Sequence, residues 1–286
     1  YPDQKLDKYI DSLIAIIGNA QEPDGYLYTA RTIDPLHPHN WAGKQRWEKE
    51  RELSHELYNA GHLYEAAAAH YLATNKKSLL NIALKNADLI CSVFGEGKLT
   101  VAPGHEIVEM GLVRLYRITG KKDYLSLAKF FIEARGHYDK YDTKSTDPWK
   151  NGAYWQDDKP VVNQTEAVGH AVRAAYLYSA VADVAALTGD KDLLSSVDQI
   201  WQNVVGKKMY VQGGIGAVPS GERFGDNYEL PNATAYNETC AAIADVFWNH
   251  RMFLLHGDSK YIDILEKTLY NGLISGVGLD GKSFFY

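Results

Sequence analysis

The chain has 286 residues, a net charge of −6 and a hydrophobic fraction of 45%. This length is sufficient for one large domain or two ordinary ones, with a sizeable core. An acidic chain without a basic patch or a nucleic-acid-binding motif argues against DNA or RNA as a partner. No run of 18 apolar residues occurs, so we expect no membrane span.

The aromatic content is the first hint of function. The chain contains 20 Tyr and 6 Trp. The flat faces of such rings cover the C–H surfaces of sugars, while their OH and N–H groups bond to sugar hydroxyls. A tyrosine-rich core explains the same composition equally well.

The two cysteines, Cys91 and Cys240, imply no disulfide framework. The polar N-terminal segment predicts a helix and not a signal peptide. Because this segment does not begin with Met, we expect the chain to belong to a longer gene product. We expect a soluble protein of the cytoplasm or the periplasm.

The first residues predict one helix followed by irregular segments. Residues 6–17 carry apolar side chains at helical spacing, which predicts an amphipathic helix. Residues 21–29 predict a turn followed by a short extended piece. Residues 33–47 are rich in Pro, His and Trp, which indicates a long loop that either lines a site or packs on its own aromatic rings.

Four helical hairpins are predicted in the rest of the chain. In each, a helix rich in small and apolar residues precedes a short turn and a returning helix that alternates charged and apolar residues. The first helices contain or begin at Gly61-His62, Gly104-His105, Gly169-His170 and Thr239-Cys240, and they end near Thr74, Thr119, Thr188 and His256. This asymmetry predicts an all-α fold with an inner and an outer ring of helices, an (α/α) barrel. The long linkers 138–164 and 207–239 are expected to carry function or to cover an opening.

The stretch 221–240, GERFGDNYELPNATAYNETC, holds three candidate catalytic groups: Glu222, Glu238 and Cys240. Its glycines and its proline predict an ordered loop, and Asn237 is the predicted N-cap of the helix that follows. Glu238 and Cys240 then lie where the helix dipole favours a carboxylate and a thiolate. A Glu-x-Cys pair can offer an oxygen and a sulfur to zinc, although a capping carboxylate beside a buried thiol is the more frequent arrangement.

Three Gly-His dipeptides place His62, His105 and His170 at or near the starts of predicted inner helices. A single histidine of this kind is usually a capping or packing residue. If the hairpins close into a ring, however, all three point into one cavity. Imidazoles bond to sugar hydroxyls and also bind zinc, so both roles stay open at this point.

The two carboxylates indicate a sugar-active enzyme. Cleavage of a glycosidic bond needs a proton donor at the leaving oxygen and a group that stabilises or attacks the anomeric carbon. Cys240 held as a thiolate is a strong nucleophile. Two other functions fit the same residues: a sugar isomerase or epimerase that uses His pairs, and a non-catalytic carbohydrate-binding protein.

Seven motifs cover nearly the whole chain: HELYNAGH (55–62), GHEIVEMGLVRLY (104–116), VGHAVRAAYLY (168–178), MYVQGGIGA (209–217), GERFG (221–225), LPNATAYNETCAAIA (230–244) and LDGKSFFY (279–286). Together they resemble glycoside hydrolase family 127, whose best-known members are β-L-arabinofuranosidases. The resemblance implies an (α/α)6 catalytic barrel over residues 1–286, incomplete in this chain, with β-rich accessory domains outside it. It also implies a retaining hydrolase that cleaves β-L-arabinofuranosides or a related plant-cell-wall sugar through a zinc-bound cysteine thiolate.

The site residues implied by the resemblance follow from the motifs. Glu222 in GERFG matches the general acid/base, and Glu238 and Cys240 in NETC match two zinc ligands. The substrate-binding histidines are matched by His62, His105 and His170, and His55 is a neighbouring candidate for the role of His62.

One departure from the family pattern concerns the nucleophile. The family's other two zinc ligands are an adjacent Cys-Cys pair, expected after the segment that resembles LDGKSFFY, and one of these two cysteines is the nucleophile. Cys91 is predicted to be a buried thiol in an outer helix and does not substitute for it. We therefore expect this chain to be the core of a larger catalytic protein. The expected partners are zinc, a plant-derived oligosaccharide or glycoside and, as an open alternative to a monomer, a second copy in a homodimer.

Overall fold

The computed structural model describes residues 3–284 and 286, and the regular elements among these residues are all helices. Backbone segments pair only through isolated bridges in this part of the chain, for example between His170 and Arg223. The predicted all-α class is therefore confirmed. Tyr1, Pro2 and Phe285 lie outside the described residues, and Phe285 belongs to the motif LDGKSFFY.

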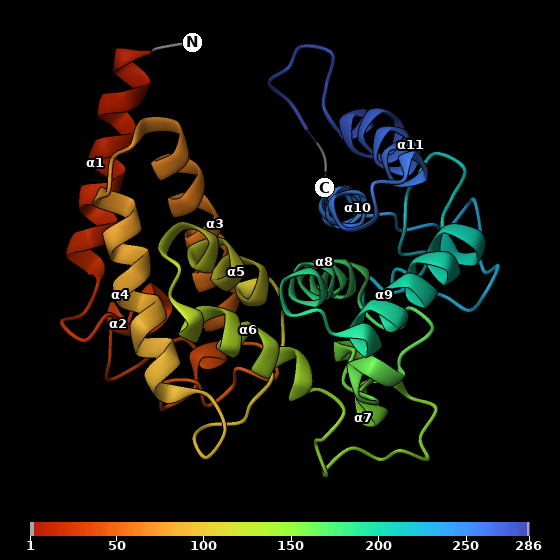
Figure 1. Ribbon diagram of the computed structural model, residues 1–286, viewed down its shortest axis with the longest axis horizontal. Coiled ribbons are helices and arrows are strands. Elements are labelled where there is room, and N and C mark those ends of the chain that lie inside the picture. Colours follow the sequence, from red (N-terminus) through yellow and green to blue (C-terminus); the bar gives the residue numbers. More distant parts are fainter. Residues whose placement is uncertain (1–2, 285) are drawn as a thin grey trace. The chain divides into compact units, whose positions relative to one another are not determined.

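The chain divides into two compact units, Tyr1–Phe131 and Ile132–Tyr286 (Figure 1). The boundary falls near the end of helix α6, Lys122–Glu133. The single catalytic domain expected over residues 1–286 stays a prediction. Within the described residues, no helix combines the length and the apolar character needed to cross a bilayer.

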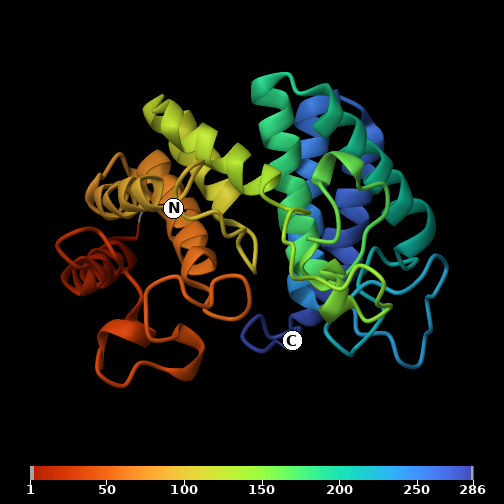
Figure 2. The ribbon, with the colours of Figure 1, turned by 90° about the horizontal axis from the view of Figure 1, so that it is seen from below.

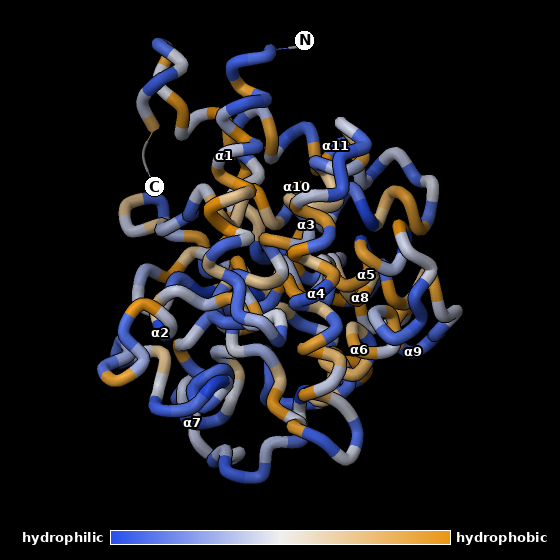
Figure 3. The backbone as a smooth tube through the Cα atoms, turned by 90° about the vertical axis from the view of Figure 1, so that its left-hand side faces the viewer, coloured by the Kyte–Doolittle hydropathy of each residue, from blue (hydrophilic) through white to orange (hydrophobic). Residues whose placement is uncertain are grey.

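Unit 1 is built from helices that pack in sequence. It contains α1 (Gln4–Ala20), α2 (Thr29–Thr32), the 3₁₀ turn η1 (Asn40–Ala42), α3 (Glu56–Thr74), α4 (Ser78–Val93), α5 (Val108–Thr119) and most of α6. Helix α1 packs on α4, α4 on α3 and α3 on α5. The predicted amphipathic helix is confirmed as α1, along which hydrophilic and hydrophobic stretches alternate in Figure 3. Asp3 begins it, because its side chain accepts hydrogen bonds from the backbone N–H groups of Lys5 and Leu6.

Helices α3 and α5 touch backbone to backbone through two glycines. A Cβ atom on Gly111 of α5 would lie 2.8 Å from the carbonyl oxygen of Gly61 and 2.9 Å from Cβ of Tyr64 on α3. A Cβ atom on Gly61 would lie 2.6 Å from the backbone nitrogen of Val108. No side chain fits at either position, so the glycines set how closely the two helices approach.

Unit 2 carries the two remaining hairpins and the longest loops. It contains α7 (Pro148–Asn151), the 3₁₀ turns η2 (Ala153–Trp155) and η3 (Val161–Asn163), α8 (Ala171–Thr188), α9 (Lys191–Asn203), the π-helical turn η4 (Val204–Lys208), α10 (Thr239–His256), α11 (Ser259–Lys267), the π-helical turn η5 (Thr268–Leu273) and the 3₁₀ turn η6 (Ile274–Gly276). Helix α8 packs along α10, while α9 packs on α8 and α11 on α10. In both units, then, the small-residue helices contact one another, and α4, α9 and α11 each cover the helix before them.

Helix α8 is the most deeply buried element of unit 2. Every residue from Ala171 to Ala185 is buried. Arg251 of α10 places its Nε 2.7 Å from Oδ2 of Asp183 on α8, and both side chains are at most 10% exposed. Because a buried charge without its partner is costly, this ion pair fixes how α10 lies along α8.

The two long loops of unit 2 run at the same end of its helices, as Figure 2 shows for the green segment before α8 and the teal-to-blue segment before α10. The predicted linkers are confirmed as largely irregular chain, interrupted only by α7, η2, η3 and the end of η4. The starts of α8 and α10 therefore lie close to both loops.

The contact between α3 and α5 gives a prediction about stability. We expect Gly111→Ala to lower the free energy of unfolding of the full-length protein by about 1–3 kcal/mol, because the added methyl group forces the helix backbones apart. Gly206→Ala is the matched control, since a Cβ atom at Gly206 meets no atom within 4 Å and its φ is not positive. Chemical denaturation measures both, and equal stabilities for the two variants would contradict the close packing.

Candidate active site

Two loops of unit 2 are joined by backbone hydrogen bonds that bring Glu222 next to His170. The N–H of Ala171 donates to the carbonyl of Glu222 over 2.9 Å, and the N–H of Phe224 donates to the carbonyl of Gly169 over 2.9 Å. Glu222 itself has φ +53°, a left-handed conformation that is uncommon for a residue with a side chain. The pairing with the start of α8 thus holds Glu222 in a conformation that it would rarely adopt alone.

The carboxyl group of Glu222 is held at both oxygens. Its Oε2 lies 2.9 Å from Nε2 of His170, and its Oε1 accepts a hydrogen bond of 3.1 Å from the hydroxyl of Tyr236. The Glu222 side chain is 36% exposed, whereas that of His170 is 7% exposed. This carboxyl group is therefore oriented by the protein and also open to a ligand.

His170 is the N-cap of α8. Its Nδ1 accepts from the backbone N–H of Val172 at 3.2 Å and from that of Arg173 at 3.5 Å. The capping role that the sequence assigns to a single histidine is present here, together with the contact to Glu222. Both ring nitrogens of His170 are consequently engaged.

Glu238 begins α10 in place of Asn237. The predicted N-cap is wrong by one residue: Glu238 has the extended conformation of an N-cap, with φ −57° and ψ 139°, and Asn237 lies before the helix with φ +46°. The reason is the loop behind it, since the N–H of Asn237 donates to the carbonyl of Gly216 and that of Tyr236 to the carbonyl of Ala217. These bonds keep Asn237 in the loop and turn the chain into the helix one residue later.

Glu238, which is buried, and Cys240, which is half-buried, offer a pair of ligand atoms. Burial raises the pKa of Glu238, and hydrogen bonds with Tyr286 and Cys240 act in the opposite direction. Burial and the neighbouring Glu238 raise the pKa of the Cys240 thiol to about 11. At neutral pH this environment keeps Cys240 protonated unless a cation stabilises the thiolate.

The donor atoms around Glu238 fit a metal ion. Within the described residues, no hydrogen bond reaches Oε2 of Glu238, although this atom is buried. One ligand atom from each of His170, Glu222 and Glu238 can be chosen so that all three lie within 4.8 Å of one another. Carboxylate, imidazole and thiolate are the groups that bind zinc. The His170 and Glu222 atoms already bond to each other. Cys240 does not belong to this group of three, but its thiol is a hydrogen-bond partner of Glu238 and offers a further donor beside that carboxyl group.

The structure places the predicted histidines differently from one another. His62 lies inside α3 and is exposed, His105 is buried in the loop before α5, and only His170 caps a helix. In unit 1 the ring of Tyr58 lies 4.5 Å from that of His62 and 4.3 Å from that of His105, centroid to centroid. The ring of His55, the alternative candidate, lies 5.5 Å from that of His105.

The rings of His55, Tyr58, His62 and His105 form one cluster in unit 1, whereas His170 belongs to unit 2. The convergence of His62, His105 and His170 on a single cavity stays a prediction. The glycines of the Gly-His dipeptides, in contrast, are explained by packing: a Cβ atom on Gly169 would lie 2.1 Å from the carbonyl oxygen of Ala153, just as Gly61 leaves no room against α5.

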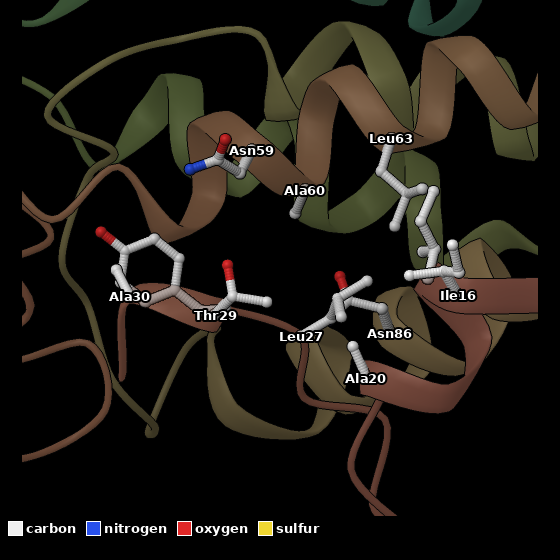
Figure 4. A pocket seen from close by; sticks show the side chains of 11 residues that line it. Ile16, Ala20, Leu27, Thr29, Ala30, Asn59, Ala60, Leu63 and Asn86 are labelled. Carbon is white, nitrogen blue, oxygen red and sulfur yellow. The ribbon is translucent and has the colours of Figure 1, made fainter. Parts of the chain in front are cut away.

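Neither Cys91 nor the residues that line a cavity in unit 1 were predicted to belong to the site. Cys91 lies half-buried in α4, where burial raises its pKa to about 11. A cavity of about 480 Å³ lies between α1, the segment before α2, α3 and α4 (Figure 4). Asn86, a buried polar residue of its lining, already bonds to the hydroxyl of Tyr64 and to the carbonyl of Gly25.

The comparison with known proteins agrees with this geometry. Residues 1–286 match the family model described as beta-L-arabinofuranosidase, GH127 catalytic domain. The chain belongs to glycoside hydrolase family 127. The predicted family and the all-helical fold are thereby confirmed.

Three relatives show how far the likeness to GH127 proteins extends. A non-reducing end beta-L-arabinofuranosidase of Bifidobacterium longum subsp. longum is 38% identical over 299 residues, which cover 100% of this chain and 45% of the relative. A solved GH127 beta-arabinofuranosidase is 59% identical, with a TM-score of 0.94 over 100% of this chain and 44% of that one. A GH127 beta-L-arabinofuranosidase structure from Geobacillus stearothermophilus is 46% identical, with a TM-score of 0.90 over 99% of this chain and 45% of that one. The chain therefore spans less than half the length of these relatives.

Tyr236 is the site residue of this GH127 chain that sequence reasoning missed. Its only signal was its position two residues before Glu238 in a stretch without helical periodicity. Tyr58 was missed for a similar reason, since it stands between two histidines that drew attention first. Tyrosine is common in this chain, which contains 20, so neither residue stood out.

Lys208 forms hydrogen bonds to both of the loops that carry Glu222 and His170. Its Nζ donates to the carbonyl of Ala167 over 2.8 Å and to that of Gly225 over 3.0 Å, and it lies 2.8 Å from Oε1 of Glu166. The Lys208 side chain is only 4% exposed. A buried ammonium group bonded in this way ties the segment before His170 to the segment after Glu222.

We expect Lys208→Met to destabilise the full-length GH127 protein by about 2 kcal/mol, because two carbonyl groups lose a charged donor. Activity should fall as well, since the loop of Glu222 is released. Lys207→Met is the matched control, because Lys207 is the exposed neighbouring lysine. Thermal unfolding of both variants measures the effect. A melting temperature of Lys208→Met equal to that of Lys207→Met would argue against a stabilising role of the Lys208 bonds between the two loops.

Proposed function

We propose that the protein to which this chain belongs is a glycoside hydrolase that cleaves β-L-arabinofuranosides or a related plant-cell-wall sugar. The observation that supports this most directly is the carboxyl group of Glu222, which is half-exposed and held at both oxygens by His170 and Tyr236. It stands in a chain of family 127, and two relatives are described as beta-L-arabinofuranosidases.

In this proposal Glu222 is the general acid and then the general base. It gives its proton to the leaving oxygen as the glycosidic bond breaks, and it later takes a proton from the water that attacks the anomeric carbon. Its two fixed partners hold the carboxyl group in one orientation during both steps. Such positioned proton transfer typically contributes a factor of about 10²–10⁴ to the rate.

The finer part of the proposal is a retaining mechanism with a cysteine nucleophile. The resemblance assigns the attacking sulfur to a cysteine other than Cys91 and Cys240. In the first step this sulfur bonds to the anomeric carbon while the leaving oxygen departs with the proton of Glu222. In the second step water gives a proton to Glu222 and attacks the anomeric carbon from the face opposite the sulfur, which departs as a thiolate. The two successive inversions retain the configuration.

Zinc is the cofactor that we propose for this site. Glu238 would offer an oxygen and Cys240 a sulfur, and together with further ligands they would hold the ion. When bound, zinc keeps coordinating thiols deprotonated near neutral pH. Two features support such a role: the buried Oε2 of Glu238, to which none of residues 3–284 and 286 forms a hydrogen bond, and the raised pKa of Cys240.

The proposed sugar contacts come from the histidines. His62 and His105, which share the ring of Tyr58, would bond to hydroxyls of the substrate from unit 1. His170 would contact the substrate beside Glu222. A plant-derived glycoside is the substrate class that we propose, in line with the family resemblance.

The acid/base role can be tested with Glu222→Gln in the full-length protein. An amide cannot transfer the proton, so we expect hydrolysis of an alkyl β-L-arabinofuranoside to fall by about 10²–10⁴-fold. Glu229→Gln is the matched control, because Glu229 is exposed in the same loop and its Oε2 only accepts from the N–H of Asp226. Wild-type hydrolysis by Glu222→Gln would disprove the assignment.

The metal site can be tested by its zinc content. We expect the full-length protein as isolated to hold about one zinc ion per site, and Glu238→Gln and Cys240→Ser each to lower the bound zinc measured by elemental analysis. Removal of zinc with a chelator should abolish hydrolysis, and added zinc should restore it. Metal-independent conversion of free reducing sugars would instead indicate an isomerase or epimerase, and tight sugar binding without turnover would indicate a carbohydrate-binding protein.

A further inference from the structure

The two oxygens of the Glu222 carboxyl group have different partners. Oε2 faces an imidazole nitrogen of His170, and Oε1 faces the hydroxyl of Tyr236. We propose that Tyr236 is a positioning residue that directs the exchanged proton of Glu222 to Oε1. This inference depends on the proposed acid/base role of Glu222.

The start of α8 fixes which nitrogen of His170 carries hydrogen. The N–H groups of Val172 and Arg173 point at Nδ1, so this atom accepts hydrogen bonds and has no proton of its own. A neutral imidazole with an unprotonated Nδ1 carries its hydrogen on Nε2. His170 therefore donates from Nε2 to Oε2 of Glu222, and Oε2 is occupied by a fixed donor.

A fixed donor at Oε2 leaves Oε1 for the proton. If Oε2 itself carried hydrogen, that hydrogen would meet the N–H of His170, and one of the two bonds would be lost. The hydroxyl of Tyr236 has no such restriction, because a hydroxyl both donates and accepts. It can donate to the carboxylate and, after a rotation about its C–O bond, accept from the carboxylic acid until the leaving oxygen of a bound substrate replaces it as the acceptor of that proton.

The surroundings of Tyr236 suit its proposed role as the hydrogen-bond partner of Oε1 of Glu222. A phenol is a weak acid, so the hydroxyl of Tyr236 keeps its proton at neutral pH. Its backbone N–H donates to the carbonyl of Ala217 over 3.2 Å, and the next residue is bound to Gly216. The backbone of Tyr236 is thus held by a pairing that is independent of the contact between its hydroxyl and Glu222.

The consequence concerns the proton transfer more than substrate affinity. Without the hydroxyl of Tyr236, Oε1 loses its partner and the carboxyl group can turn about its last bond. The acidic proton is then presented to the leaving oxygen in only a fraction of encounters. A leaving group that departs easily needs little help from this proton, whereas a poor leaving group depends on it.

Tyr236→Phe in the full-length, zinc-loaded protein tests the proposal. We expect kcat/KM for an alkyl β-L-arabinofuranoside to fall by about tenfold, which corresponds to the loss of one hydrogen bond of about 1.4 kcal/mol. For the dinitrophenyl β-L-arabinofuranoside we expect a fall of less than about twofold, since that leaving group requires little protonation. The ratio of the two kcat/KM values does not depend on the fraction of the variant that is folded. Partial unfolding of Tyr236→Phe would therefore not change this ratio.

Tyr228→Phe is the matched control, because Tyr228 is exposed in the same loop and is 70% accessible. It should leave both kcat/KM values unchanged. An equal fall for both substrates in Tyr236→Phe, or no fall for either, would overturn the positioning role. If Glu222→Gln retains wild-type hydrolysis, the proposed function fails; if Glu222→Gln is inactive and Tyr236→Phe keeps the wild-type ratio, only the role of Tyr236 fails.

Discussion

The backbone pairing between the start of α8 and the loop after η4 is the contact on which the candidate site depends. Ala171 and Glu222 lie far apart in sequence, and their hydrogen bond, with the one between Phe224 and Gly169, makes them neighbours. Glycine is required at position 169, where φ is +69° and a Cβ atom would collide with the chain at Ala153. One short pairing thus places the proposed acid/base residue against a helix N-terminus whose capping side chain is also its hydrogen-bond partner.

Buried polar groups behind the loops hold this pairing in place. Asn203 at the end of α9 accepts from the N–H of Ala167, and Lys208 bonds to the carbonyl of the same residue. On the other side, Thr268 donates to Asp245 of α10 and reaches the carbonyl of Gly213 in the loop. Burial raises the pKa of Asp245 to about 7, so this carboxyl group is sensitive to the loss of its partner. Breaking any one of these buried hydrogen bonds costs free energy, because it leaves a buried polar group without its partner. Together the bonds hold the loops in a single conformation.

Much of this could be predicted from the sequence, because the deciding patterns are local. Helical spacing located α1 and the four hairpins, and the spacing of glycine, proline and asparagine marked the loop of Glu222. The N-cap of α10 was misplaced by one residue because pairing of Asn237 with Gly216 is a contact between distant segments. Tyr236 was missed for the same reason, because its importance depends on a hydrogen bond to Glu222, which lies in another part of the loop. The Gly-His pattern predicted His62, His105 and His170 at or near helix starts, yet of these three only His170 caps a helix, and His62 lies inside α3.

The two glutamates of the site differ in surroundings, and this difference suits each one to the separate role that we propose for it. Glu222 is half-exposed and receives a donor at each oxygen, so it is oriented and can meet a substrate. Glu238 is buried, one of its oxygens has no hydrogen bond within the described residues, and its neighbour Cys240 has a raised pKa. Removal from water disfavours the charged forms of both Glu238 and Cys240, and a cation would reverse that preference for both at once. An acid/base group and a metal-ligand pair can therefore stand side by side in one loop, because access to water separates their roles.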